Sequence, residues 1–289
     1  MKTLAICIPS YNCGKYIRET IESVLSQIDT PDEIIISDDH STDDSSAIIE
    51  QYRDNLTIRF LKPSRRLTIG QHYRFLLENA KSDFVTFLSA DDVLFPNFVS
   101  SIRRVISTEQ DVKLVAGACI ETDGLLNVIQ ARGTGRQVSL YPYPEGFVYM
   151  ASGNLYTVSF SAMDRKALLE APILSADADL ATDWYWALWL TANGSLAFVK
   201  KPLGFYRIHQ SNAGHNNSKW DNALPPMLRF LVPHLNEYGQ QIIKSRLIDF
   251  SQVTPPKVAR ASIMSSFKRF LKVAQAMPYR RMSSSLRKK

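Results

Sequence analysis

The stretch Phe84-Val85-Thr86-Phe87-Leu88-Ser89-Ala90-Asp91-Asp92 decides the fold class that we expect for this chain. Its apolar half is typical of a buried strand, and two adjacent carboxylates follow where that strand ends. An unpaired carboxylate is costly to bury, whereas at the carboxyl end of a strand in an α/β sheet it reaches the crevice where ligands bind. Asp91 and Asp92 therefore predict a site for a hard divalent cation, Mg²⁺ or Mn²⁺. A solvated turn that caps the helix after Pro96 would explain the same residues.

Strand and helix patterns alternate on both sides of this stretch. Strands are expected over residues 4–8, 33–37, 56–61 and 84–88, and helices over residues 16–27, 43–52 and 71–80. Strands separated by helices of this length indicate βαβ units, and hence an α/β fold with a mainly parallel central sheet flanked by helices. Because no glycine-rich phosphate loop follows the first strand, a dinucleotide oxidoreductase is disfavoured.

The rest of the chain gives weaker patterns. We expect strands over residues 113–120 and 196–199, helices over 164–170 and 184–190, an irregular loop over 138–149 and a mobile polar loop over 213–220. Residues 223–277 are expected to form helices that break at prolines 225, 226, 233, 255 and 256.

Composition bounds the class of protein. The 289 residues are 45% hydrophobic, which is enough to fill a sizeable core, and the three cysteines have no metal-ligand spacing. Free cysteines are typical of a reducing compartment. The apolar start at residues 4–8 is too short for a secretory signal, and no apolar run reaches the length of a membrane span. We therefore expect a soluble or peripheral intracellular protein.

The net charge of +6 is concentrated at the carboxyl-terminal end. No acidic residue follows Asp249, whereas ten basic residues do, so an anionic partner is expected for this tail. Residues 257–277 can be drawn as a basic amphipathic helix, which favours an anionic membrane surface. Packing of its apolar face on the rest of the protein is the alternative. Nucleic acid is a poorer partner, because no aromatic platform accompanies the charge.

Polar groups also follow other predicted strands: Pro9-Ser10-Tyr11-Asn12 after the first, Ser37 to Asp43 after the second, and Tyr206-Arg207-Ile208-His209 in the second half. Strand-end carboxylates such as Asp38 and Asp39 can accept hydrogen bonds from a base or a ribose. Capping of the next helix is the alternative for residues 38–43, and we expect both: Asp38 and Asp39 face a ligand, and residues 41–43 start the helix.

These motifs, in this order, resemble the family-2 glycosyltransferases with the GT-A fold, of the non-processive type that builds bacterial surface polysaccharides. The resemblance covers residues 3–212 and also includes the Gly70 to Arg74 stretch and Thr182-Asp183-Trp184. It implies a glycosyltransferase domain over residues 1–215, with a nucleotide-binding half at 1–110 and an acceptor half at 111–215. A helical extension with the basic tail follows over residues 216–289.

The resemblance also implies roles for individual residues. The nucleotide would be bound by Pro9, Tyr11, Asn12, Asp38, Asp39, Arg74, Ser89 and Ala90. Asp91 and His209 would hold the metal, Asp183 would be the catalytic base, and Asp92, Trp184 and Arg207 are further candidates. A structural histidine at 209 and a helix N-cap at 183 are the alternatives. Since a base must be ionised, we expect Asp183 not to be deeply desolvated, and we expect Trp184 to stack on a sugar.

Three residues depart from the family pattern. Ser89 stands where the first Asp of the family's Asp-x-Asp motif is usual, so the metal would rest mainly on Asp91. His40 replaces a common glycine, and Phe75 replaces a common asparagine.

The activity implied is inverting, metal-dependent transfer of one hexosyl or N-acetylhexosaminyl group from a nucleotide-sugar, by default a UDP-sugar, to a hydroxyl of a saccharide acceptor. The acceptor includes polyprenyl-diphosphate-linked saccharides of O-antigen or capsule synthesis, and the place of action would be the cytoplasmic face of the inner membrane. A non-catalytic sugar-nucleotide-binding module and a sugar-nucleotide pyrophosphorylase are the alternatives.

Overall fold

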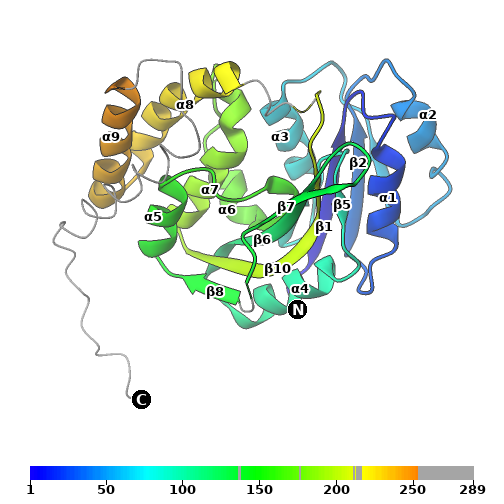
Figure 1. Cartoon of the computed structure of the whole chain (residues 1–289), viewed down its shortest axis with the longest axis horizontal. Helices are drawn as coiled ribbons and strands as arrows, with labels where there is room; N and C mark the ends of the chain where they lie inside the picture. The colour runs from blue at the N-terminus through cyan, green and yellow to red at the C-terminus, as the bar shows by residue number, and fades with distance from the viewer. Residues whose placement is uncertain (136–137, 176, 211, 213–216, 253–289) are drawn as a thin grey trace.

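The parallel half of the sheet is built as the sequence predicts. The structure is a computed structural model that describes residues 1–135, 138–175, 177–210, 212 and 217–252. The strands β1 (Leu4–Ser10), β2 (Glu33–Asp38), β3 (Ile58–Leu61) and β4 (Phe84–Phe87) are parallel and lie in the order β3-β2-β1-β4 (Figure 1). Because β1 has β2 on one side and β4 on the other, the carboxyl ends of the strands open a crevice at β1.

The second half of the sheet is mixed. Beyond β4 the order continues with β9 (Ser161–Asp164), β6 (Val112–Thr122), β10 (Ser195–Arg207) and β5 (Val93–Leu94), while β7 (Val128–Arg132) pairs with β6 and β8 (Val138–Tyr141) pairs with β10. We expected β10 only over residues 196–199. It is longer because it pairs with β6 along its length, through register shifts at Val199 and Pro202, and so extends to Arg207 at the crevice.

The loop that we expected over residues 138–149 is wrong. This segment contains β8 and the helix α5 (Glu145–Ala151). β8 is an edge strand whose Tyr141 pairs with Leu196 of β10, and α5 buries Phe147 and Met150 completely. These contacts are long-range, whereas the local sequence is rich in Tyr, Pro and Gly and is typical of a loop. The sequence pattern therefore predicted neither element.

Helices cover both faces of the sheet. These are α1 (Ile17–Leu25), α2 (Ser45–Glu50), α3 (Ile69–Asn79), α4 (Phe98–Thr108), α6 (Arg165–Glu170) and α7 (Thr182–Ala192), with short 3₁₀ turns at η1 (Val158–Phe160) and η2 (Asp179–Ala181). The apolar faces of α1 and α4 pack against one side of β1, while α3, α5 and α7 contribute to the core on the other side. The helix α3 begins with a capping box, in which Thr68 accepts a hydrogen bond from the Gln71 N–H.

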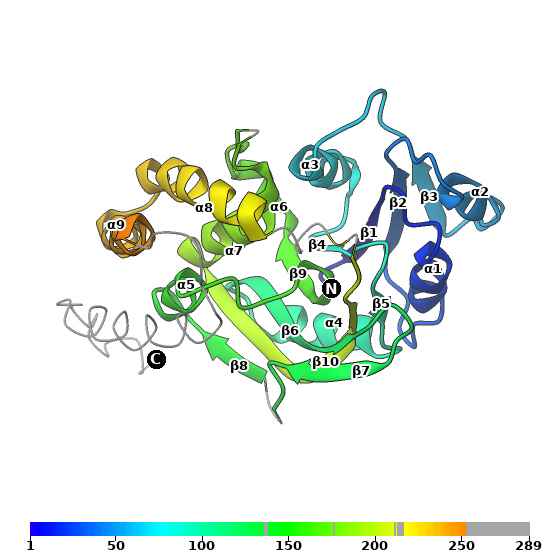
Figure 2. The ribbon, with the colours of Figure 1, turned by 45° about the horizontal axis from the view of Figure 1, so that its top comes forward.

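A helical layer closes the far end of the molecule. It consists of α8 (Asn217–Leu231), the 3₁₀ turn η4 (Val232–His234) and α9 (Glu237–Gln252), which lie beside α5 and α7 and far from α1 and α2 (Figures 1 and 2). The break that we expected at Pro225 and Pro226 is wrong, because α8 runs through both prolines. Burial of Leu224, Met227 and Leu228 against the core offsets the lost backbone hydrogen bonds.

The structure contradicts part of one prediction for the carboxyl-terminal region and does not describe the residues of another. Residues 217–220, which we expected in a mobile loop, belong to α8. The prolines at 255 and 256 and the basic segment at 257–277 lie outside the described residues. Within the described ranges, no helix is both long enough and apolar enough to cross a membrane.

A buried contact joins the two halves of the domain beside the crevice. The Gly70 N–H at the start of α3 donates to Asp179 Oδ2 of η2 over 2.9 Å. A Cβ at position 70 would lie 2.2 Å from Asp179 Oδ1 and 2.5 Å from Thr182 Oγ1, so only glycine allows this approach.

We expect Gly70→Ala to lower the free energy of unfolding by about 1–3 kcal/mol, the usual cost of overpacking a tight contact. Urea titration followed by circular dichroism measures it. Gly239→Ala in α9 is the matched control, because its new Cβ would come no closer than 3.2 Å to Leu235 Cβ. Equal losses in the two variants would contradict this account of the contact.

Candidate active site

A cavity of about 780 Å³ opens at the carboxyl ends of β1, β2 and β4. One wall comes from the nucleotide-binding half predicted from the sequence, and the other comes from segments between β7 and α7. The polar lining residues used below are Ser10, Tyr11, Asn12, Asp39, Arg66, Ser89, Asp91, Arg132, Asn154, Asp179, Asp183, Tyr206, His209 and Asn212. Pro9 and Ala90 also line it. The tertiary structure thus brings together most of the residues that the sequence singled out.

One end of the cavity holds a buried carboxylate under an aromatic ring. Asp39 is fully buried and accepts hydrogen bonds from the Arg66 guanidinium and, over 3.1 Å, from the Leu67 N–H. The Arg66 guanidinium carbon also lies 3.4 Å from the centre of the Tyr11 ring, which is exposed to the cavity. A flat ring, a cation and a carboxylate at one place suit a planar, hydrogen-bonding heterocycle.

The neighbouring turn explains one departure from the family pattern. His40 has a φ of 60°, in the left-handed region where glycine is favoured. Its Nε2 lies 3.0 Å from the Pro63 carbonyl oxygen, a hydrogen-bonding distance that fixes the ring. The backbone conformation is therefore kept although the side chain is larger.

Asp38 does not line the cavity, so our expectation that it faces the ligand is wrong. Its carboxylate accepts hydrogen bonds from the hydroxyls of Ser41 and Ser46, the second over 2.6 Å, and so ties down the start of α2. Asn12 does line the cavity, but its Oδ1 accepts from the Thr42 N–H over 2.8 Å. Adjacent strand-end residues thus separate into a cavity-lining and a structural carboxylate, because successive side chains point to opposite faces.

Arg74 lies away from the cavity, which corrects its predicted role with the nucleotide. It pairs with Glu78 over 2.7 Å along the surface of α3 and donates to the carbonyl oxygen of Leu169 over 3.3 Å. The arginine that reaches the cavity is Arg66, from the loop before α3.

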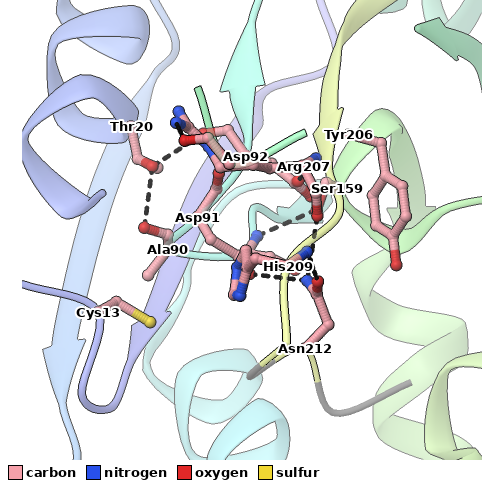
Figure 3. Close-up of polar contacts among 12 residues, drawn as sticks. Cys13, Thr20, Ala90, Asp91, Asp92, Ser159, Tyr206, Arg207, His209 and Asn212 are labelled. Carbon is pink, nitrogen blue, oxygen red and sulfur yellow. Dashed lines mark hydrogen bonds and ion pairs between the residues drawn. The ribbon is translucent and has the colours of Figure 1, made fainter. Parts of the chain in front are cut away.

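Asp91, His209 and Asn212 line the cavity, and their side chains converge (Figure 3). His209 Nε2 lies 2.8 Å from Asp91 Oδ2, and Asn212 Nδ2 donates to the same oxygen over 3.1 Å. The His209 ring stacks on the Tyr16 ring with 4.7 Å between their centres. This stacking and the hydrogen bonds fix the imidazole edge toward the carboxylate.

Asp92 and Arg207 support this centre from behind and do not line the cavity. Asp92 is fully buried and accepts from Ser159 Oγ and, over 2.9 Å, from the Arg207 N–H. Burial raises the pKa of Asp92 well above its ordinary value, and the nearby Asp91 carboxylate adds to the rise. The Arg207 side chain donates to the Asp91 carbonyl oxygen over 2.7 Å and pairs with Glu19 over 2.6 Å.

The residues at this centre fit a divalent cation that is shared with a substrate. Among the described residues, no cluster of three His, Cys, Asp or Glu side chains could enclose a metal. A carboxylate oxygen and an imidazole nitrogen 2.8 Å apart can nevertheless both turn to one ion. Mg²⁺ and Mn²⁺ sites often use one or two protein ligands and take the remaining oxygens from phosphates and water.

Asp183 lines the same cavity from the first turn of α7. Its Oδ2 accepts from Asn154 Nδ2 over 3.1 Å and its Oδ1 from the Trp184 N–H over 2.7 Å. Burial raises the pKa of Asp183, which differs from our expectation of little desolvation. The N-cap alternative is not supported, since Ala181 holds that position.

Trp184 is in the core, which corrects its predicted role as a sugar platform. Its side chain is 2% exposed, and Nε1 donates to the Met150 carbonyl oxygen of α5 over 2.8 Å. The indole therefore fixes the start of α7 and, with it, the position of Asp183.

The family model for Glycosyl transferase family 2 matches residues 5–170 of the chain. The chain belongs to this family. Among curated relatives, GlyG of Streptococcus pneumoniae is 30% identical over 39% of this chain and 38% of its own length. The β-1,3-glucosyltransferase WfaP of Escherichia coli is 33% identical over 43% of this chain and 49% of its own. The poly(ribitol-phosphate) β-N-acetylglucosaminyltransferase TarS of Staphylococcus aureus is 29% identical over 76% of this chain and 38% of its own length.

Solved structures share the fold of this family-2 chain. TarS 1–349 in complex with UDP-GlcNAc superposes with a TM-score of 0.68 over 93% of this chain and 81% of that one, at 16% identity. The mannosyltransferase PcManGT from Pyrobaculum calidifontis, in complex with GDP-Man and Mn²⁺, superposes with a TM-score of 0.63 over 96% of this chain and 76% of that one, at 14% identity. The GT-A fold expected from the sequence is confirmed.

Several cavity residues used above were missed from the sequence. They are Arg66, Arg132, Asn154, Asp179 and Asn212. Each lies in a loop or at the end of an element, in a segment without periodic pattern, and reaches the cavity through contacts with residues far away in the chain. The pair Arg65-Arg66 before a predicted helix was the only local signal.

The raised pKa of Asp183 predicts a stability cost. A carboxyl group whose pKa is higher in the folded than in the unfolded state loses stabilising free energy as the pH rises through the folded pKa. We therefore expect Asp183→Asn to melt at least about 2 °C above the wild type at pH 7, with the difference shrinking toward pH 4.

Differential scanning calorimetry at several pH values measures this difference. Asp177→Asn, at an exposed position six residues earlier, is the matched control and should leave the melting temperature unchanged. A lower melting temperature for Asp183→Asn at pH 7 would show that the ionised carboxylate stabilises the fold.

Proposed function

We propose that the protein transfers one hexosyl or N-acetylhexosaminyl group from a UDP-sugar to a hydroxyl of a saccharide acceptor, with inversion at the anomeric carbon. The observation that carries the proposal is the placement of Asp183 in one cavity with the Asp91–His209 pair. The proposal places the donor diphosphate at the Asp91–His209 pair, the acceptor hydroxyl at Asp183 and the transferred sugar between them. The name of WfaP, which includes UDP-Glc, and the UDP-GlcNAc complex of TarS support a UDP-sugar.

The donor would bind with its base at the Tyr11 end. Uracil is planar and carries an N–H that the buried Asp39 carboxylate can accept, while the Tyr11 ring offers a stacking surface. The Arg66 guanidinium, already paired with Asp39, can turn toward a carbonyl oxygen of the base. The backbone at Ser89 and Ala90 then lines the route toward Asp91.

The reaction would be a single in-line displacement. The acceptor oxygen forms its bond to the anomeric carbon while the bond from that carbon to the diphosphate oxygen breaks, and the diphosphate leaves as UDP. Asp183 takes the proton of the acceptor hydroxyl, and its raised pKa increases its strength as a base. A divalent cation held by Asp91 and His209 would supply Lewis-acid stabilisation of the leaving diphosphate.

The proposed acceptor is a saccharide of surface polysaccharide synthesis, which includes a polyprenyl-diphosphate-linked one. WfaP is named for an acceptor of this kind, and TarS for a poly(ribitol-phosphate) acceptor. Such a lipid would place the enzyme at an anionic membrane surface on the cytoplasmic side. The ten basic residues after Asp249 are consistent with that surface.

The base-binding end can be tested by comparing two arginines of neighbouring segments. We expect Arg66→Ala to weaken UDP binding about tenfold, because a charge-assisted contact to the base is lost. Arg74→Ala should change it less than twofold, since Arg74 lies outside the cavity. Isothermal titration with UDP and Mn²⁺ measures both, and equal effects of the two substitutions would refute the assignment.

The decisive experiment for the activity uses Asp183→Asn. Loss of a general base reduces turnover by about 10²–10⁴-fold, whereas UDP binding should stay within twofold of the wild type. Turnover is measured as acceptor-dependent release of UDP, with Asp177→Asn as the control. Full turnover in Asp183→Asn would show that Asp183 is not the general base. Binding of UDP without turnover by the wild type would favour the non-catalytic module that Ser89, in place of an acidic ligand, suggests.

A further inference from the structure

Arg132 brings a positive charge to the wall of the cavity that also carries Asp183. It ends β7 and lines the cavity together with Asn154, Tyr156 and Thr157. The predicted nucleotide-binding motifs do not include it. Its guanidinium is partly open to solvent, with 38% of the side chain exposed.

A buried carboxylate holds this guanidinium in place. Arg132 Nη1 lies 3.2 Å from Glu121 Oε1, and the Glu121 side chain is only 2% exposed. Glu121 pairs with Gln130 across the β6–β7 ladder, and the Gln130 amide donates to its other oxygen. Arg132 is two residues further along β7 on the same face, so its contact with Glu121 is a diagonal cross-strand pair.

This geometry leaves donors of Arg132 for a ligand. A guanidinium has five N–H groups in a planar fork, and the Glu121 contact involves one edge of it. The other cavity arginine, Arg66, is paired with Asp39 and lies over Tyr11 at the base-binding end. The two cations therefore belong to different parts of the lining, Arg66 to the loop before α3 and Arg132 to the end of β7.

We propose that Arg132, held by Glu121, binds a phosphate group of the acceptor, so that the enzyme selects phosphate-bearing saccharides over neutral ones. The proposal rests on the proposed function, which places the acceptor hydroxyl at Asp183. An arginine fork matches the oxygens of a phosphate bidentately. Four aspartates, at positions 39, 91, 179 and 183, line the same cavity, so an anionic acceptor needs a fixed cation to enter it.

The position of Arg132 favours the acceptor over the leaving diphosphate as its ligand. The leaving group is assigned to Asp91 and His209. Arg132 pairs in register with Cys119, whose Sγ lies 3.9 Å from Thr157 Oγ1, and the neighbouring Tyr156 hydroxyl donates to the Asp183 carbonyl oxygen. Arg132 therefore adjoins the part of the lining that carries the base. A saccharide whose hydroxyl meets Asp183 would present the phosphate on its anomeric carbon to the same wall.

The test compares two probes on the full chain loaded with UDP and Mn²⁺. One is N-acetylglucosamine α-linked through a diphosphate to a farnesyl chain, and the other is the same sugar linked directly to the chain. Isothermal titration should show the wild type binding the diphosphate probe at least about tenfold more tightly, as expected for a charge-assisted bidentate contact. Arg132→Gln should lose most of this preference, and Arg132→Lys should keep part of it.

Two controls separate recognition from folding. The double variant Glu121→Gln/Arg132→Gln removes both charges together, so no buried carboxylate is left unpaired. It should lose the preference for the diphosphate probe as Arg132→Gln does. Arg59→Gln, on β3 and outside the cavity, should keep the wild-type preference.

Three results would overturn the proposal. The first is a wild type that shows no preference for the diphosphate probe, which includes a wild type that binds neither probe. The second is an Arg132→Gln variant that keeps the preference. The third is an Arg132→Gln variant that also binds UDP more weakly, which would assign Arg132 to the donor diphosphate. Failure of the wild type to bind UDP with Mn²⁺ would instead count against the proposed function itself.

Discussion

The buried carboxylate of Asp92 is the constraint on which the centre of the active site depends. It joins three segments that are distant in the chain: the turn after β4, the 3₁₀ turn at Ser159 and the end of β10 at Arg207. Its raised pKa shows that burial is unfavourable for its charge, so its hydrogen bonds must hold it in place. Their effect is to fix the backbone on both sides of the cavity, which sets the distance between Asp91 and His209.

The second constraint is the contact between the two halves of the domain. Gly70 and Asp179 bring the start of α3 against the turn before α7, so the loop that carries Arg66 and the helix that carries Asp183 share one buried junction. Arg66 and Asp183 are thus placed relative to each other by the same atoms. Trp184 fixes the helix from the other side. A substitution at this junction is therefore expected to affect stability and catalysis together.

The carboxylates of the cavity differ in their burial and in their hydrogen-bond partners. Asp39 is buried against an arginine, whereas Asp91 is held by neutral donors and a histidine. Asp183 is held by an amide and a backbone N–H, and burial raises its pKa. Removal of this charge is expected to stabilise the fold, so in the proposed function Asp183 would be a residue whose catalytic role costs stability.

The sequence by itself determined the parallel half of the sheet and the residues at its strand ends, because local periodicity and the position of carboxylates after apolar runs carry that information. Asp39, Asp91, Asp183 and His209 were found in this way and through the family resemblance. Only the tertiary structure decided that Asp38, Asp92 and Arg207 support the site, that Arg74 and Trp184 lie outside it, and that Arg66 and Arg132 line it. The reason is that which face of a turn a side chain occupies, and which distant partner holds it, depend on contacts that no local pattern records.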